Sequence, residues 1–166
     1  MESAVLENEM EQQEGVPPQL LLVGWNEWCG LPALGIDGLK AKIDTGARTS
    51  VLDAVEIVEQ WREASLWVSF AVRCDRSSGE MVWCTVPVVD QRIIKNSTGD
   101  CQRRYTINTL LRIGQQEWTI DVTLTDRGRM ALPMLLGRGA LKGRVLVDPA
   151  RRCCQGDVLS DVDIRG

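Results

Sequence analysis

Asp44 stands where an alternating stretch of the sequence ends and a glycine turn begins. Residues 41–48 read Ala-Lys-Ile-Asp-Thr-Gly-Ala-Arg, and such a turn would present one carboxylate at a fixed place. Carboxylates hydrolyse a peptide bond in pairs that share a proton, because one activates water while the other hydrogen-bonds the carbonyl oxygen. One chain therefore supplies half of such a pair, and a second copy would have to supply the other half.

The residues that follow Asp44 would form an active-site loop made of Thr45, Gly46, Ala47 and Thr49. Thr45 could hydrogen-bond to the facing loop that carries the second carboxylate. This contact would keep the two carboxylates of the pair aligned with each other. Gly46 lets the backbone pass close and offers its amide to the carboxylate. The Asp-x-Gly pattern is also a common turn, so the motif alone leaves an ordinary turn open.

Arg48 places a guanidinium four residues after Asp44. A fixed cation beside a cleft favours a ligand with acidic side chains. Together with Arg103 and Arg104, farther along the chain, it predicts that an acidic substrate is bound and cleaved at or near glutamate. The alternative is a structural ion pair between Arg48 and Asp53, or an acid at a subunit interface, because buried arginines are usually paired.

The composition excludes several kinds of chemistry. Histidine is absent, and no Cys-x-x-Cys pair occurs among the six cysteines. A Ser-His or Cys-His catalytic pair and any zinc site with histidine ligands are therefore excluded. No glycine-rich loop ending in Gly-Lys-Ser/Thr is present to cradle phosphates. The sequence predicts no metal site and no cofactor.

The net charge of -4 is concentrated at the start of the chain, where the first 14 residues carry five glutamates and no basic residue. The remaining 18 acidic residues face 19 basic ones, so no nucleic-acid partner is expected. The first apolar run, residues 20–23, is too short for a signal peptide core or a membrane span. We therefore expect a cytoplasmic protein without a membrane partner and with reduced cysteines.

Short segments of β character separated by turn signals predict a mainly β domain over residues 19–150, either a barrel or a sandwich. An acidic, disordered lead is expected at residues 1–18 and a flexible tail at residues 151–166. The expected strands are residues 39–43, 66–72 and 85–89, the last an edge strand because of its proline, then a hairpin of residues 104–113 and 117–125. The candidate helices are residues 51–61 and 139–142.

Residues 134–141 read Met-Leu-Leu-Gly-Arg-Gly-Ala-Leu, and this motif after an early Asp-Thr-Gly-Ala resembles retropepsins. More specifically, five stretches in order resemble the bacterial retropepsin-like aspartic peptidase family, the RimB-like group formerly labelled as ATP-dependent zinc proteases. The stretches are residues 24–28 (GWNEW), 31–35 (LPALG), 40–50 (KAKIDTGARTS), 124–127 (LTDR) and 134–138 (MLLGR). The resemblance spans residues 22–150.

The resemblance implies a single lobe of the retropepsin-like closed β-barrel with one short C-terminal helix. It also implies an aspartic endopeptidase that acts as a homodimer, with an Asp44 from each subunit meeting at the two-fold axis. A member of the group is associated with trimming glutamate tails added by a RimK-type ligase. The candidate substrate is therefore an acidic or polyglutamylated peptide or protein, such as the glutamate-rich tail of a ribosomal protein.

Further site residues follow from the same resemblance. In the family a late strand packs beside the aspartate loop, which would give Leu136, Gly137 and Arg138 a supporting role. Residues 93–105 occupy the place of the retropepsin flap, a hairpin that closes over substrate. An ordinary polar hairpin loop is the alternative. The tip of this hairpin, with a role in substrate binding, would be Ser97, Thr98 and Gly99.

The chain departs from the family at two positions. Members often carry histidine where this chain has Asp53 and again near Asp100, which weakens a zinc site further. The second functional hypothesis is a non-catalytic peptide-binding module with a peptidase-like fold. It would be favoured if the protein remained a monomer, because the second carboxylate would then be missing.

Overall fold

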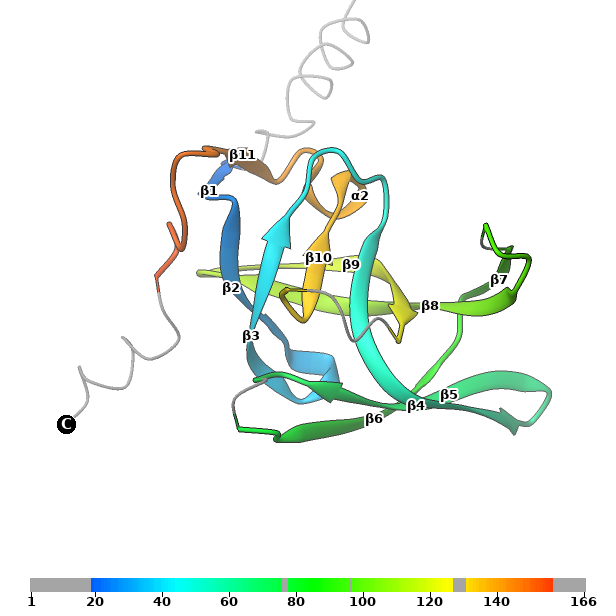
Figure 1. Ribbon diagram of the computed structural model, residues 1–166. Coiled ribbons are helices and arrows are strands. Elements are labelled where there is room, and N and C mark those ends of the chain that lie inside the picture. The colour runs from blue at the N-terminus through cyan, green and yellow to red at the C-terminus, as the bar shows by residue number, and fades with distance from the viewer. Residues whose placement is uncertain (1–18, 76–77, 96, 127–130, 157–166) are drawn as a thin grey trace, which may run out of the picture.

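The computed structural model describes residues 19–75, 78–95, 97–126 and 131–156. Strands make up most of these ranges, as Figure 1 shows. The strands are β1 (Leu21–Val23), β2 (Asn26–Leu31), β3 (Ile36–Ile43), β4 (Ser50–Arg62), β5 (Ser65–Arg73), β6 (Met81–Pro87), β7 (Asp90–Lys95), β8 (Cys101–Ile113), β9 (Gln116–Thr125), β10 (Met134–Leu136) and β11 (Val145–Val147). The 3₁₀ helix η1 (Pro32–Leu34) follows β2, and the helix α2 (Arg138–Leu141) is the short helix expected at residues 139–142.

Six strands close into a barrel in the order β10-β3-β2-β8-β9-β4. β10 runs parallel to β3, with Leu136 opposite Ile43. It also runs antiparallel to β4, with Met134 opposite Leu52, so the last of the six strands returns to the first. Closure satisfies the backbone hydrogen bonds that the edges of an open sheet would leave unpaired. The predicted retropepsin-like closed β-barrel with one short helix is confirmed.

The barrel interior is filled by alternate residues of its strands. Along β9, the side chains of Trp118, Ile120, Val122 and Leu124 are buried, as the alternation of apolar and polar residues predicts. The Trp118 indole N–H also donates to the backbone oxygen of Ala140 at 2.9 Å. Burial and this hydrogen bond hold α2 against the end of the barrel that carries the Asp44 loop.

Two extensions leave the barrel. β4 continues beyond it into an antiparallel sheet with β5 and β6, of which β6 is the outermost strand, as its proline predicts. β8 also extends beyond the barrel, because its pairing with β9 begins only at Tyr105. The residues of β8 before Tyr105 pair with β7 instead. The pairing of β7 with β8 runs from Lys95 opposite Cys101 to Asp90 opposite Thr106. The β7–β8 hairpin therefore projects beyond β9 (Figure 1).

The candidate helix over residues 51–61 is wrong, because these residues belong to β4. The spacing of Val51, Val55 and Val58 imitates one face of a helix. Glu56, however, has a φ of 53°, and the register with β5 shifts between Val55 and Val58. This β-bulge interrupts the two-residue alternation of the strand, and the β-branched residues on either side suit an extended backbone.

Residues 151–156 lie along β1 and β2 rather than leaving the domain. The Cys153 N–H donates to the backbone oxygen of Asn26 at 2.9 Å. The Gln155 side-chain amide donates to the backbone oxygen of Leu22 at 2.7 Å. The flexible tail predicted from residue 151 is therefore wrong for these six residues, which hydrogen bonds hold in place although they offer little apolar surface.

The acidic lead expected at residues 1–18 lies outside the described residues, as do residues 157–166 of the expected tail. Within the part of the chain that the structure describes, no helix has the length and apolar character needed to cross a membrane.

Candidate functional site

The loop that carries Asp44 is held from both sides. The Asp44 N–H donates to the backbone oxygen of Leu136 at 2.9 Å, which fastens the loop to the end of β10. The Gly46 N–H donates to Asp44 Oδ1 at 3.0 Å. Asp44 is half-buried, and none of the described residues hydrogen-bonds to its Oδ2. The loop thus fixes one carboxylate oxygen and leaves the other available to a ligand or a solvent molecule.

The start of α2 forms the second support of this loop. The Arg138 N–H donates to the backbone oxygen of Ala47 at 2.8 Å, and the Gly139 N–H to that of Arg48 at 3.0 Å. The Arg138 guanidinium donates to the backbone oxygen of Thr45 at 3.0 Å. The backbone oxygens of three loop residues, Thr45, Ala47 and Arg48, therefore accept hydrogen bonds from the first turn of one short helix.

Gly137 allows this close approach. Its N–H donates to Ser50 Oγ at 3.1 Å, and its backbone passes directly beside the loop. A Cβ at this position would lie 2.5 Å from the backbone oxygen of Thr49 and 2.9 Å from that of Ala47. Only glycine fits without moving the Asp44 loop.

An open cleft of about 1490 Å³ adjoins the loop. Its floor is the outer face of β8 and β9, where polar residues alternate with the buried ones. Across this floor, Asn108 donates from its side-chain amide to Asp121 Oδ1 at 2.9 Å. The floor is formed by Arg104, Thr106, Asn108, Thr119, Asp121 and Thr123. The walls come from the Asp44 loop with α2 and β11, and from β7.

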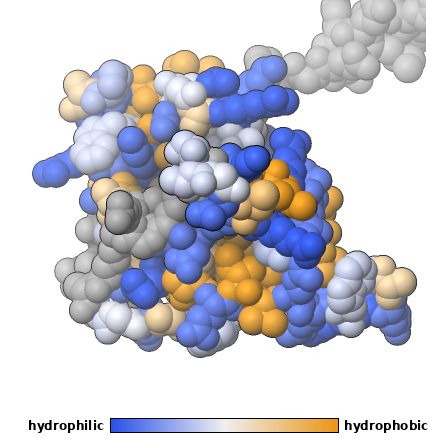
Figure 2. Space-filling model, turned by 45° about the vertical axis from the view of Figure 1, so that its right-hand side comes forward, coloured by the Kyte–Doolittle hydropathy of each residue, from blue (hydrophilic) through white to orange (hydrophobic). Residues whose placement is uncertain are grey.

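The charged residues of the cleft are mainly basic. The acids among its lining residues are Asp90 and Asp121. Asp90 already pairs with Arg92, at 3.0 Å from the guanidinium Nε, and Asp121 is hydrogen-bonded across the floor. The basic residues are Arg48, Arg92, Arg104, Arg138 and Lys142. Figure 2, which brings the β7–β8 side of the molecule forward, shows hydrophilic side chains around hydrophobic ones at the centre and in the lower half of this face.

The structure brings five of the site residues expected from the sequence to this cleft: Thr45, Arg48, Thr49, Arg104 and Arg138. The other members of the loop, Asp44, Gly46 and Ala47, adjoin the cleft without lining it. Leu136 and Gly137 are buried behind the loop. Ser97, Thr98 and Gly99 lie between β7 and β8, exposed and away from the cleft lining.

Sequence reasoning missed Arg92, Asn108, Asp121 and Lys142, all of which line the cleft. The alternation that predicted β8 and β9 also places every second residue on one outer face, and this signal could have shown that Asn108 and Asp121 share a surface. No comparable local signal exists for Arg92 and Lys142, because separate parts of the fold bring them to the same cleft.

No cluster of three or more cysteine, aspartate or glutamate side chains suited to hold a metal ion occurs among the described residues. The six cysteines are all free thiols. Arg48 is exposed and makes no ion pair with any described residue, so the pairing with Asp53 that the sequence left open is not formed.

A protein-family model described as RimB-like, the retropepsin-like aspartic endopeptidase RimB, matches residues 22–157. A curated protein of Desulfotalea psychrophila is 44% identical to the chain over 140 residues, and one of Shewanella pealeana is 42% identical over 137 residues. Both carry the name "Probable alpha-L-glutamate ligase". The match covers 82% of this chain but only 30% of the length of either relative.

A solved structure is also similar to this fold. It is a protein of unknown function from Legionella pneumophila, 28% identical to the chain, with a TM-score of 0.68. The match covers 81% of this chain and 98% of the other. The barrel with its extensions therefore occurs in that protein as nearly the whole chain, and in the curated relatives as part of a longer protein.

The expectation of an aspartic endopeptidase, made from the sequence, is contradicted by the curated relatives. Four proteins that are 40 to 44% identical are named glutamate ligases and not peptidases. The description of the family names an endopeptidase, so it disagrees with the names of these four relatives. The physical reason for the error is that the Asp-Thr-Gly turn specifies a loop geometry, and the same fold can support different functions.

Proposed function

Because this chain belongs to the RimB-like family of retropepsin-like proteins, and its curated relatives are named for glutamate ligation, we propose that its barrel serves α-L-glutamate ligation. In this role the domain holds the glutamate-bearing polypeptide, and a separate ATP-dependent unit forms the bond. The chain matches only 30% of the length of those relatives, which leaves room for such a unit in them.

The observation that carries the proposal is the excess of cations in the cleft. A chain of glutamates presents carboxylates on both sides of an extended backbone. Guanidinium groups bind carboxylates with two parallel hydrogen bonds, and the more weakly hydrated Arg releases its water more readily than Lys. Arg48 on one wall and Arg104 on the floor lie on separate elements, so a ligand that spans the cleft can meet both.

A second element of the proposal is the assembly. The short sheet of β1 and β11 pairs Leu22 with Leu146, and these apolar side chains are 41% and 56% exposed. Exposed apolar residues on a two-stranded sheet suit an isologous contact with a second copy. We therefore retain the homodimer as part of the proposal, together with a cytoplasmic location, which the free thiols of the described cysteines favour.

Binding is tested first with the purified protein and penta-α-L-glutamate, with penta-α-L-glutamine as the neutral comparison. We expect the acidic peptide to bind at least about tenfold more tightly, with an affinity that falls as salt rises. Arg48→Gln should weaken it by about three- to tenfold. Arg152→Gln, an exposed arginine outside the cleft, is the matched control and should leave it unchanged. Equal binding of the two peptides overturns the proposal.

The role in ligation is tested in the Desulfotalea psychrophila relative. Deletion of the segment that this chain matches should shorten the glutamate chains formed with ATP, and this protein added in trans should restore them. Product lengths are read by mass spectrometry. Unchanged products after deletion contradict the proposal. Shortening of penta-α-L-glutamate by the purified chain alone would also contradict it, because a holding domain leaves its ligand intact.

A further inference from the structure

The two faces of the β7–β8 hairpin have different neighbours. Arg92 on β7 lies opposite Arg104 on β8, and both line the cleft. Consecutive residues of a strand point to opposite faces, so Arg103 and Tyr105 belong to the other face of β8. One face of the hairpin thus carries two cations of the cleft, of which Arg92 uses its Nε for the pair with Asp90 and keeps its two terminal nitrogens for a ligand. The other face turns toward the β4–β5 extension.

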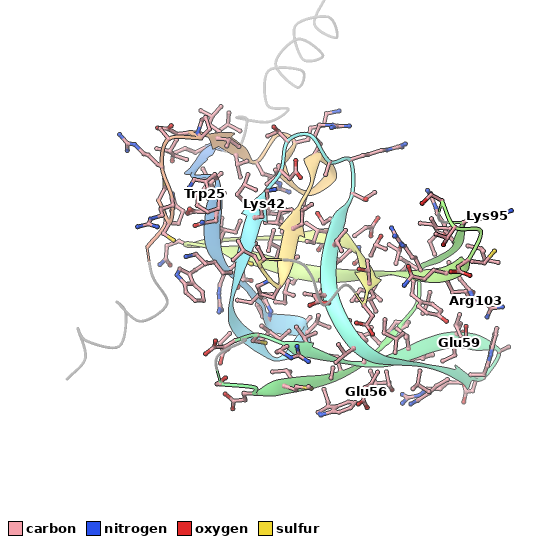
Figure 3. All side chains as sticks on the ribbon, in the orientation of Figure 1. Trp25, Lys42, Glu56, Glu59, Lys95 and Arg103 are labelled. Carbon is pink, nitrogen blue, oxygen red and sulfur yellow. The ribbon has the colours of Figure 1, made fainter. Side chains whose placement is uncertain are left out.

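Glu59 of β4 meets that second face. Its Oε1 accepts a hydrogen bond from the Arg103 guanidinium at 2.9 Å and another from the Tyr105 hydroxyl at 2.7 Å. Figure 3 shows Glu59 below Arg103 where the two extensions approach each other, with Glu56 earlier in β4 and away from the pair. We call Glu59, Arg103 and Tyr105 the brace.

The hairpin needs such a contact because of its place in the sheet. The β8 residues from Cys101 to Arg104 do not pair with β9 and are hydrogen-bonded to β7 alone. A two-stranded hairpin is marginally stable when nothing packs on it. Tyr105 is the residue at which the pairing of β8 with β9 begins. It is also a member of the brace, so the brace lies where the hairpin leaves the barrel. Movement about this point would displace Arg92 and Arg104 relative to the other residues that line the cleft.

We infer that Glu59 is the positioning residue of the cleft: by holding Arg103 and Tyr105, it places Arg92 and Arg104 to receive the carboxylates of an acidic chain. Glu59 itself does not touch the ligand. The same strand, β4, begins at Ser50 beside the Asp44 loop, where Ser50 accepts the N–H of Gly137. One strand therefore contacts the support of that loop and, through Glu59, the β8 strand of the hairpin. The identity of the ligand rests on the proposed function, whereas the position of the hairpin does not.

The first experiment needs no ligand. Hydrogen exchange of the amides in β7 and in residues 101–104 is compared between the wild type, Glu59→Gln and Glu56→Gln. Glu56→Gln removes the same charge from the same strand outside the brace. Glu59→Gln should speed the exchange of these amides by about tenfold, through easier local opening, and leave the barrel amides unchanged. Exchange equal to that of the wild type overturns the inference.

The second experiment uses the sign of the effect on penta-α-L-glutamate binding. Loss of a negative charge beside a basic cleft would, by charge alone, tighten the binding of an acidic ligand. Loss of the positioning contact predicts the opposite, a weakening of about three- to tenfold. Glu59→Gln and Tyr105→Phe should both weaken binding, and Glu56→Gln should not.

Glu59→Asp tests the effect of side-chain length separately from the effect of charge, because it keeps the carboxylate but shortens the side chain. It should fail to restore either the slow exchange or the affinity. Tighter peptide binding by Glu59→Gln overturns the inference. So does a Glu59→Asp variant whose hydrogen exchange and peptide affinity both equal those of the wild type. Faster exchange in Glu59→Gln, combined with no binding of the peptide by the wild type, overturns the proposed function and leaves Glu59 as the residue that holds the hairpin.

Discussion

The carboxylate of Glu27 on β2 accepts the backbone N–H of Gln155 at 2.8 Å, from a residue 128 positions later in the chain. The same fully buried carboxylate accepts the N–H of Cys154 at 2.8 Å and that of Gly24 at 3.3 Å. Three backbone amides thus surround one buried charge. The contact joins the end of the described chain to the first strands of the barrel.

Glu27→Ala should reduce the free energy of unfolding by about 2–4 kcal/mol, because it leaves buried N–H groups without an acceptor. Urea denaturation followed by tryptophan fluorescence measures the loss. Glu117→Ala, an exposed glutamate on β9, is the control and should change the stability by less than about 0.5 kcal/mol. Equal stability of the two variants would show that the three hydrogen bonds contribute little.

A chain that ends at Arg152 should lose nearly as much stability as Glu27→Ala, because the Glu27 carboxylate loses two of its three backbone donors. The comparison chain ends at Gly156 and keeps all three contacts. Combining Glu27→Ala with the shorter chain should cost much less than the sum of the two separate losses, since both remove the same hydrogen bonds. Additive losses would mean that the end of the chain is held by other contacts.

Gly137→Ala should disturb the Asp44 loop, since the new methyl group would meet two backbone oxygens that cannot move independently. We expect a loss of about 3 kcal/mol, the upper end for overpacking, together with weaker peptide binding. Gly139→Ala is the milder comparison, with one contact of 3.3 Å to the backbone oxygen of Arg48. Thermal unfolding of both variants checks the order, and a reversed order would contradict the geometry.

The brace should contribute to stability in a pH-dependent way. Hydrogen bonds from Tyr105 and then Arg103 lower the pKa of Glu59 below its ordinary value of 4.5. A carboxyl group with a lowered folded-state pKa stabilises the fold above the ordinary value, and this contribution is lost as the pH falls through the lowered one. The stability difference between the wild type and Glu59→Gln should be constant down to about pH 4.5 and shrink below it. A difference that grows on acidification would contradict this assignment.

The cysteines should differ in reactivity according to burial. Burial, with a smaller contribution from the Glu27 carboxylate, raises the pKa of the Cys29 thiol to about 12, and burial raises that of Cys84 to about 11. Because the thiolate is the reactive form, iodoacetamide at neutral pH should modify the exposed Cys101 and spare Cys29 and Cys84 in the folded protein. Mass spectrometry of the digested protein identifies the sites. Equal modification would mean that the core around Cys29 on β2 and Cys84 on β6 opens readily.

Much of the fold was predictable from local pattern. The alternation over residues 117–125, the turn at Gly114 and the proline at the end of β6 all act within a few residues. The first two predicted the β8–β9 hairpin, and the proline predicted an edge strand, although the strand is Met81–Pro87 and not residues 85–89. The Asp44 turn was likewise visible, because a strand that ends in Asp-Thr-Gly has few ways to continue. The same reasoning failed at β4, where the bulge at Glu56 gave an extended strand the spacing of a helix.

What the sequence determined by itself was the β class of the domain, the turn that carries Asp44 and the family to which the chain belongs. The tertiary structure alone decided that Arg92 and Lys142 share a cleft with Arg48, that Glu59 holds the β7–β8 hairpin, and that Glu27 holds the end of the described chain. The physical reason is distance along the chain. Hydrophobic alternation and turn chemistry act between near neighbours, whereas these contacts join residues between 44 and 128 positions apart and arise only when the barrel closes.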